Sequence, residues 1–207
     1  MLVCGLVQAQ QLAGPVAAPS ATKAVEAPAL VAQLALAKKG SADAQFLVAG
    51  MYERGQGAPQ SYVEAAKWYR LAAEQGHAGA QFFLGAMYGS DRGVPRDFVE
   101  AVNWYQKSAA QGYRDALYPV AYAYENGITV QQDFVESHKW YLRSAEAGVW
   151  QAMDRLARAY TAGELGLKPD AEQASIWRAK ATAAQGDQRI INAPARQRSA
   201  NQNEANK

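Results

Sequence analysis

Hydrophobic and small residues recur between residues 41 and 186 in a pattern that returns every 36 positions. Tyrosine marks one point of the pattern and tryptophan another, and the last tryptophan comes one residue late: Tyr52, Tyr88, Tyr124, Tyr160, Trp68, Trp104, Trp140 and Trp177. A fixed period of about 20 to 50 residues is the signature of stacked structural repeats. We therefore predict a repeat protein. A reactive centre is normally a single constellation of residues, so a recurring pattern indicates architecture rather than catalysis.

Each period contains two segments whose apolar residues have helical spacing. In the first period, these segments are residues 41–54 and 62–75. Gly55 and Pro59 interrupt the pattern between them, where a helix cannot easily continue. Gly76 follows the second segment, and glycine readily adopts the left-handed conformation that ends a helix. Each period is therefore predicted to form a helical hairpin.

The start of each second helix has the spacing of a capping box. Ser61 and Glu64 form the first pair, in which the serine accepts from a free backbone N–H and the glutamate reaches back to the cap residue. The same spacing recurs at Asp97 and Glu100, Asp133 and Glu136, and Asp170 and Gln173. Four such signals in the same place fix where the second helices begin.

Small and apolar side chains share one face of each predicted helix. In the first period these are Ala44, Val48 and Tyr52 in the first helix, and Ala65, Trp68 and Ala72 in the second. Small residues let a neighbouring helix approach closely, and the tryptophan is expected to fill space between repeats. One hairpin cannot bury both faces alone, so stacked copies are required. A sugar-stacking role for the tryptophans is the alternative.

These patterns divide the chain into seven segments. Residues 41–76, 77–112, 113–148 and 149–186 are predicted to be the four repeats, and 29–40 an N-terminal capping helix. Residues 1–28 are interpreted as a truncated signal-like segment and linker. Residues 187–207 are polar and are predicted to form a disordered tail.

The second repeat carries a recognisable family motif. Ala80, Leu84, Gly85 and Tyr88 are followed at residues 93–112 by Gly-Val-Pro-Arg-Asp-Phe-Val-Glu-Ala and then Trp-Tyr, Ala and Gly at fixed spacing. This motif resembles the Sel-1-like repeat family, which is related to tetratricopeptide repeats. The resemblance implies an all-α, right-handed α/α superhelical solenoid of about four hairpin repeats. Thr129 and Val130 depart from the motif, which usually has Gly and Val there.

Charge argues against nucleic acid as the partner. The chain has a formal net charge of +2, and residues 1–40 and 187–207 each contribute +2. Residues 41–186 therefore carry −2, whereas a nucleic-acid-binding face concentrates Lys and Arg. No stretch approaches the roughly 20 apolar residues that a membrane span needs.

The first residues bear on the location of the protein. Leu2 to Val7 is an apolar run, and Val7-Gln8-Ala9 resembles a signal peptidase site. We therefore expect a periplasmic or secreted protein of a bacterium, with a cytoplasmic protein as the alternative. Lipidation at Cys4, the only cysteine, is a further alternative.

The sequence offers little support for catalysis. His77 and His138 are the only histidines, and no metal-ligand motif is present. Ser20 and Lys23 have the Ser-x-x-Lys spacing of β-lactamases, but they lie in an Ala- and Pro-rich linker without the partner motifs. We predict no catalytic residue, metal ligand or cofactor. An envelope enzyme, β-lactamase-like or peptidoglycan-active, remains the alternative.

The residues opposite the packed face of each first helix are the candidate recognition site. They vary between repeats, and exposed apolar residues in a stripe mark a partner site. The predicted partner-binding residues are Phe46, Phe82, Tyr118, Tyr122, Asp154 and Arg158. The alternative is that Phe46, Phe82 and Tyr118 pack between successive first helices. We predict a monomeric, non-catalytic interaction scaffold that binds a protein or peptide on the concave face of the solenoid.

Overall fold

The computed structural model describes residues 27–192, with side chains described as far as residue 186, and this part of the chain folds into nine α-helices and no strand. The helices are α1 (Pro28–Lys38), α2 (Ala42–Arg54), α3 (Tyr62–Glu74), α4 (Ala78–Ser90), α5 (Phe98–Ala110), α6 (Arg114–Asn126), α7 (Phe134–Glu146), α8 (Trp150–Ala162) and α9 (Ala171–Asn192). The all-α fold class predicted from the sequence is confirmed. The apolar run at residues 2–7, Cys4, Ser20 and Lys23 lie outside the described residues.

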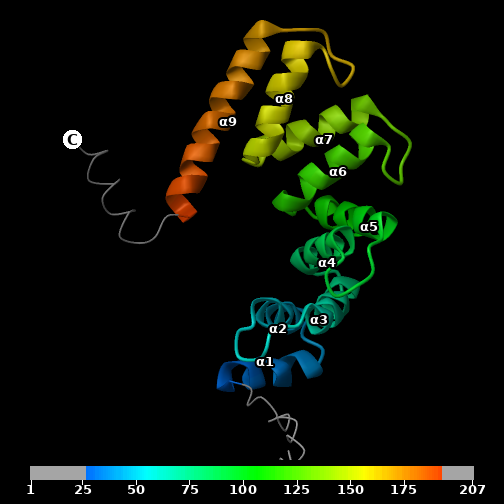
Figure 1. The fold of residues 1–207 in the computed structure, drawn as a ribbon, viewed down its shortest axis with the longest axis vertical. Coiled ribbons are helices and arrows are strands. Elements are labelled where there is room, and N and C mark those ends of the chain that lie inside the picture. Colours follow the sequence, from blue (N-terminus) through cyan, green and yellow to red (C-terminus); the bar gives the residue numbers. More distant parts are fainter. Residues whose placement is uncertain (1–26, 193–207) are drawn as a thin grey trace, which may run out of the picture.

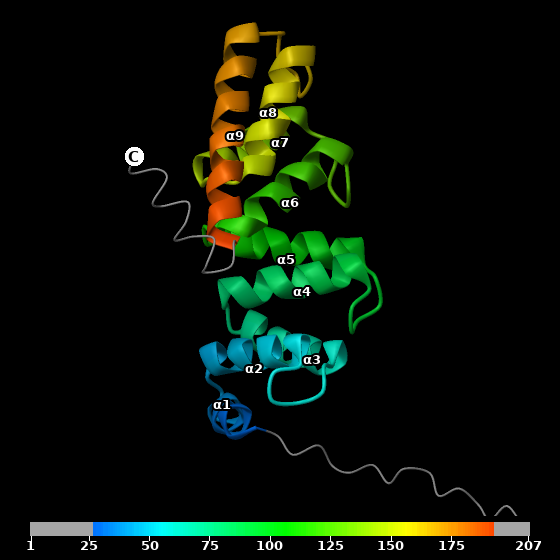
Figure 2. The ribbon, with the colours of Figure 1, turned by 60° about the vertical axis from the view of Figure 1, so that its left-hand side comes forward.

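The helices pair into hairpins that stack along one direction. Helices α2 and α3, α4 and α5, α6 and α7, and α8 and α9 pack as pairs, each pair packs on the next, and α1 packs on α2. Figure 1 shows the resulting column, with α1 at one end and the α8–α9 hairpin at the other. The helix axes change direction along the column. The axes of α2 and α4 lie across it, whereas those of α8 and α9 run along it (Figure 2).

The predicted caps start the second helices, but only half of each capping box forms. The Ser61 hydroxyl accepts from the backbone N–H of Glu64 at 3.2 Å, and Asp97, Asp133 and Asp170 accept in the same way. The backbone N–H of Ser61 instead donates to the carbonyl of Tyr52 at 3.0 Å. Because the preceding helix satisfies this N–H, the glutamate has no reason to fold back. Glu64 bonds Lys67 at 2.6 Å instead.

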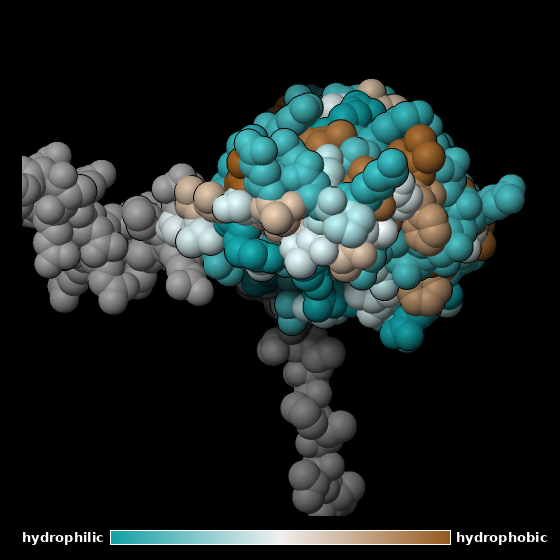
Figure 3. Space-filling model, turned by 90° about the horizontal axis from the view of Figure 1, so that it is seen from above, coloured by the Kyte–Doolittle hydropathy of each residue, from teal (hydrophilic) through white to brown (hydrophobic). Residues whose placement is uncertain are grey.

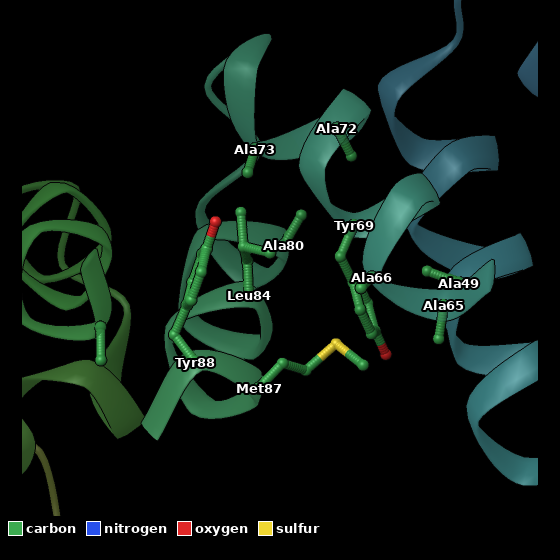
Figure 4. Close-up of a cluster of buried hydrophobic side chains, with 11 residues drawn as sticks. Ala49, Ala65, Ala66, Tyr69, Ala72, Ala73, Ala80, Leu84, Met87 and Tyr88 are labelled. Carbon is green, nitrogen blue, oxygen red and sulfur yellow. The ribbon is translucent and has the colours of Figure 1, made fainter. Parts of the chain in front are cut away.

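Alanines form most of the buried contact between hairpins. Figure 4 shows the cluster between α2, α3 and α4, where small alanine side chains surround Tyr69, Leu84 and Met87. Ala65 and Ala72 are fully buried, as the shared face of small residues predicts. Close helix approach at these positions leaves the larger side chains to fill the remaining space.

Trp104, Trp140 and Trp177 belong to the packing clusters and also keep one face toward a neighbouring cation. Trp104 is half-buried against the first cluster, and the Lys107 ammonium lies 3.9 Å from its ring centroid. The Arg143 guanidinium lies 4.3 Å from the Trp140 ring in the same relation. A cation one helical turn away stabilises each ring face. These rings are therefore part of the packing between repeats.

The last helix continues past the glycine at which the sequence pattern ends. Gly76 has a φ of 91° directly after α3, whereas Gly186 lies within α9, which runs on to Asn192. Within the described residues no further hairpin packs on α9, so no turn is required at that point. Figure 3 views the molecule from the end where α8 and α9 join, and its surface there is mainly hydrophilic, with small separate hydrophobic areas.

Candidate functional site

The structure places Phe46 and Phe82 in the packing between successive first helices. The Phe46 ring stacks on His77 with centroids 4.4 Å apart. Phe82 packs against Tyr105 at 5.7 Å and Tyr113 at 5.4 Å. Both rings are half-buried, so most of their surface serves the contact between hairpins. This is the alternative that the sequence left open for these two residues.

Tyr118 and Tyr122 lie together on α6 and differ in exposure. Tyr118 packs edge-on against Tyr141 with centroids 5.4 Å apart, and burial raises the pKa of its hydroxyl. The side chain of Tyr122 lies one helical turn further along and is 47% exposed. Of the predicted aromatic residues, Tyr122 is therefore the one most available to a partner.

The charged end of the predicted stripe is an ion pair on α8. Arg158 donates to Asp154 at 2.9 Å, and both side chains are largely exposed. Each charge therefore neutralises the other at the surface, where such a pair contributes little stability. This pair lies on α8, whereas Phe46 lies on α2, so the two ends of the predicted stripe belong to different parts of the column.

A hollow between α4, α5 and α6 brings Tyr118 and Tyr122 together with residues that the stripe did not include. We call it the α4–α6 hollow; its volume is about 470 Å³. The residues that line it include Gly89, Phe98, Tyr105, Tyr118, Pro119 and Tyr122. Every described side chain that lines it is uncharged. An apolar concavity with a few hydroxyl groups is typical of a binding site.

A second hollow of about 450 Å³ lies on the other side of the same wall. Tyr105, Tyr118 and Pro119 line both hollows, and Arg114 and Trp150 line only the second. Pro119 lies inside α6 and has no N–H to donate to the carbonyl of Asp115. Sequence reasoning missed Tyr105 and Pro119, although the proline interrupting a predicted helix was a visible signal.

The strongest electrostatic cluster in the described chain supports the fold. Glu125 accepts from Tyr141 at 2.6 Å and from Arg155 at 3.0 Å, and Arg155 also bonds Glu164 at 2.7 Å. Burial acts to raise the pKa of Glu125, but the hydrogen bonds from Arg155 and Tyr141 bring it below its usual value. These contacts join α6, α7 and α8, and they leave the carboxylate engaged rather than available as an acid or base.

Between residues 27 and 192, no three His, Cys, Asp or Glu side chains gather where they could hold a metal ion. None of the helices in this range has the length and apolar character to span a membrane.

Comparisons with known proteins agree with this architecture. Among solved structures, the protective antigen c5321 of uropathogenic Escherichia coli, which displays an SLR fold, has a TM-score of 0.70 and 34% identity over 75% of this chain and 33% of its own. A Sel1 repeat protein from Oxalobacter formigenes has the same TM-score and identity, over 75% of this chain and 61% of its own. The chain thus spans less than two thirds of either protein. A comparison with curated proteins finds no match.

The family model named Sel1 repeat matches four consecutive units, residues 42–77, 78–113, 114–149 and 150–185. Each unit contains one of the hairpins described above, and together they cover most of the chain. The chain therefore belongs to the Sel1 repeat family, as the repeated motif predicted.

Proposed function

We propose that this protein is a non-catalytic scaffold that binds a protein or peptide partner on the surface formed by α4 and α6. Sel1 repeats generally mediate protein–protein interactions, and their fold is typically a non-catalytic interaction scaffold. The observation that carries the proposal is the uncharged α4–α6 hollow, with the half-exposed Tyr122 at its edge. Stacking of the repeats leaves this surface uncovered, so it is available for recognition.

The predicted site residues take different roles in this proposal. Tyr122 is the exposed anchor, and Tyr118 forms the wall behind it. Asp154 and Arg158 offer a polar rim further along the column, where charges govern the rate and specificity of binding more than its strength. Phe46 and Phe82 hold the hairpins in place.

We place this scaffold in the bacterial cell envelope, as a periplasmic or secreted monomer. The support is the apolar run and the Val7-Gln8-Ala9 site near the start of the chain. Cell fractionation and N-terminal sequencing of the mature protein test this location. A protein found in the cytoplasm with its first residues intact would contradict it.

Partner capture from an envelope extract tests the interaction surface. The full chain is compared with Tyr122→Ala and with Phe134→Ala, a matched control that removes an aromatic side chain 42% exposed on α7. The partner retained by the full chain is expected to be lost with Tyr122→Ala and kept with Phe134→Ala. Both variants should keep the wild-type helical circular dichroism spectrum. Equal retention by the two variants would contradict the proposal.

A further inference from the structure

Three tyrosines occupy the same place in successive repeats, and their surroundings differ. Tyr69, Tyr105 and Tyr141 are 36 residues apart, each directly after the repeat tryptophan. Tyr69 and Tyr141 are 1% and 0% exposed, whereas Tyr105 is only partly buried. The middle tyrosine lines the α4–α6 hollow. At the other two sites, large side chains from neighbouring helices fill the space that is open here.

At the first site, two side chains from neighbouring helices enclose the tyrosine. The Tyr69 hydroxyl donates to the Glu53 carboxylate at 2.8 Å. The Phe83 ring stacks on the Tyr69 ring with centroids 5.3 Å apart and planes 8° apart. A carboxylate and an aromatic ring together therefore complete this site.

At the third site, the same two positions again hold large side chains. Glu125, 72 residues after Glu53, accepts from Tyr141 at 2.6 Å. Arg155, at the position of Phe83, bonds that carboxylate. A carboxylate thus recurs opposite the tyrosine, and the second position again carries a bulky group.

At the middle site, the two positions hold neither a carboxylate nor an aromatic ring. Gly89 stands where the first and third repeats have glutamate, and a Cβ on it would lie 3.9 Å from the Tyr105 hydroxyl oxygen, so a side chain at this position would face the hydroxyl. Pro119 stands where Phe83 and Arg155 stand. Among the described residues, no group accepts a hydrogen bond from the Tyr105 hydroxyl. Burial raises its pKa to about 12, so it remains a neutral donor at physiological pH.

The loop after the first helix also differs at this site. A Cβ on Gly93 would overlap the Tyr62 carbonyl oxygen, so only glycine allows the α4–α5 loop to lie against α3. Thr129 takes the corresponding position, with a φ of 64°. Because threonine has a Cβ, the close approach that Gly93 makes to Tyr62 is closed to a threonine in its place. Gly89 and Pro119, two departures from the repeat on different helices, thus line the same hollow.

We propose that the α4–α6 hollow binds an aromatic side chain and a neighbouring carboxylate of a partner polypeptide. The partner supplies the two groups that Phe83 and Glu53 supply at the first site, stacking on Tyr105 and accepting its hydrogen bond. This inference rests on the proposed function and names the chemistry of the partner.

The hydroxyl donors of the lining favour a carboxylate as the acceptor. The described lining contains hydroxyl donors, including Tyr105 and Tyr122, and no acidic side chain that would repel an anion. A hydrogen bond to a charged acceptor is shorter and stronger than one to a neutral acceptor. The ring covers the apolar wall formed by Phe98 and Pro119.

Residues 1–26 and 193–207 contain no Phe, Tyr or Trp, so these two segments do not supply the ring.

The test selects displayed dodecapeptides on the full chain and measures the best binder as a synthetic peptide. We expect enrichment of peptides that combine an aromatic residue with Asp or Glu at a constant spacing. Replacing that aromatic residue by Ala, or the acidic residue by its amide, should weaken binding about tenfold or more. Enriched peptides without both groups would overturn the proposal.

Two variants refill the hollow with the residues that other repeats carry. Gly89→Glu restores the carboxylate and Pro119→Phe restores the ring, and each should weaken peptide binding more than tenfold without lowering the melting temperature. Asn103→Glu, on an exposed position of α5 outside the lining, adds the same charge and should bind as the wild type. Tyr105→Phe should weaken binding while the fold is retained.

The outcomes separate this inference from the proposed function. Peptides that bind both refilled variants as tightly as the wild type would overturn the inference, while loss of envelope-partner capture with Tyr122→Ala would leave the proposed function standing. Sedimentation of the full chain tests a second copy as the occupant. A dimer that Gly89→Glu dissociates would overturn the inference in favour of self-association.

Discussion

Removing a single hydroxyl from each of the three equivalent tyrosines should have unequal effects on stability. Tyr69→Phe deletes a 2.8 Å hydrogen bond to Glu53, and Tyr141→Phe deletes a 2.6 Å hydrogen bond to Glu125. A hydrogen bond to a charged group contributes about 1.5–3 kcal/mol. Both carboxylates are half-buried, so water replaces part of each lost bond, and we expect the free energy of unfolding to fall by about 1.5 kcal/mol.

Tyr105→Phe should leave stability nearly unchanged. Its hydroxyl donates to no described group, so the substitution removes no protein hydrogen bond. The ring contact with Phe82 at 5.7 Å is kept. We expect the free energy of unfolding to stay within about 0.5 kcal/mol of the wild type, as for a substitution that breaks no specific interaction.

Urea unfolding followed by circular dichroism at 222 nm measures all three variants against the wild type. A loss of about 1.5 kcal/mol corresponds to a fall of about 3–6 °C in melting temperature for a domain of this size. Hydrogen exchange adds local resolution, because repeats of a solenoid can open separately. An equal loss of unfolding free energy for Tyr105→Phe would show that the Tyr105 hydroxyl has a hydrogen-bond partner in the folded protein. That result would refute the conclusion that the middle site lacks the acceptor found at the other two.

Three further predictions concern the loops and the charged cluster. Thr129→Gly should raise the free energy of unfolding by about 1 kcal/mol, measured by urea unfolding, because a β-branched residue is strained at positive φ. Gly93→Ala should lower it by about 3 kcal/mol in the same assay, because the new Cβ would overlap the backbone of Tyr62. Glu125 has a lowered pKa in the folded state, so the stability it provides is present above its unfolded pKa of about 4.3 and is lost as pH falls through the lower folded value. Unfolding measured from pH 7 to pH 3 should therefore show the gap between wild type and Glu125→Gln closing below about pH 4; a constant gap would contradict this linkage.

The helices and the family could be predicted from the sequence because the signals are local and repeated. The Ser61 hydroxyl caps the start of α3 and the positive φ of Gly76 follows its end, so one period suffices to place α3 between them. Repetition then made the stacking faces visible, since Ala65 and Ala72 recur at the same helical phase. The end of α9 could not be predicted in this way, because among the described residues no hairpin follows Gly186 to require a turn there.

The recognition stripe was harder to predict because it depends on contacts between repeats. Helical phase placed Phe46 and Phe82 on the outer face, but their rings lean toward the adjoining hairpins and pack against His77 and Tyr113. Side chains on one face of a helix can serve either solvent or the next helix, and spacing within the helix does not distinguish them. Only the arrangement of neighbouring hairpins decides which residues remain available.

In a stacked repeat protein, the departures from the repeat carry more information about binding than the repeated residues do. Side chains that follow the repeat pattern pack against one another, as Glu53 and Phe83 pack around Tyr69. A departure that only weakened packing would be costly, because loss of contacts around a buried ring destabilises the fold. Gly89 and Pro119 are two such departures on different helices, and both open onto the same tyrosine. Independent losses of packing would be spread over several junctions, so their convergence on Tyr105 favours a space that a partner fills.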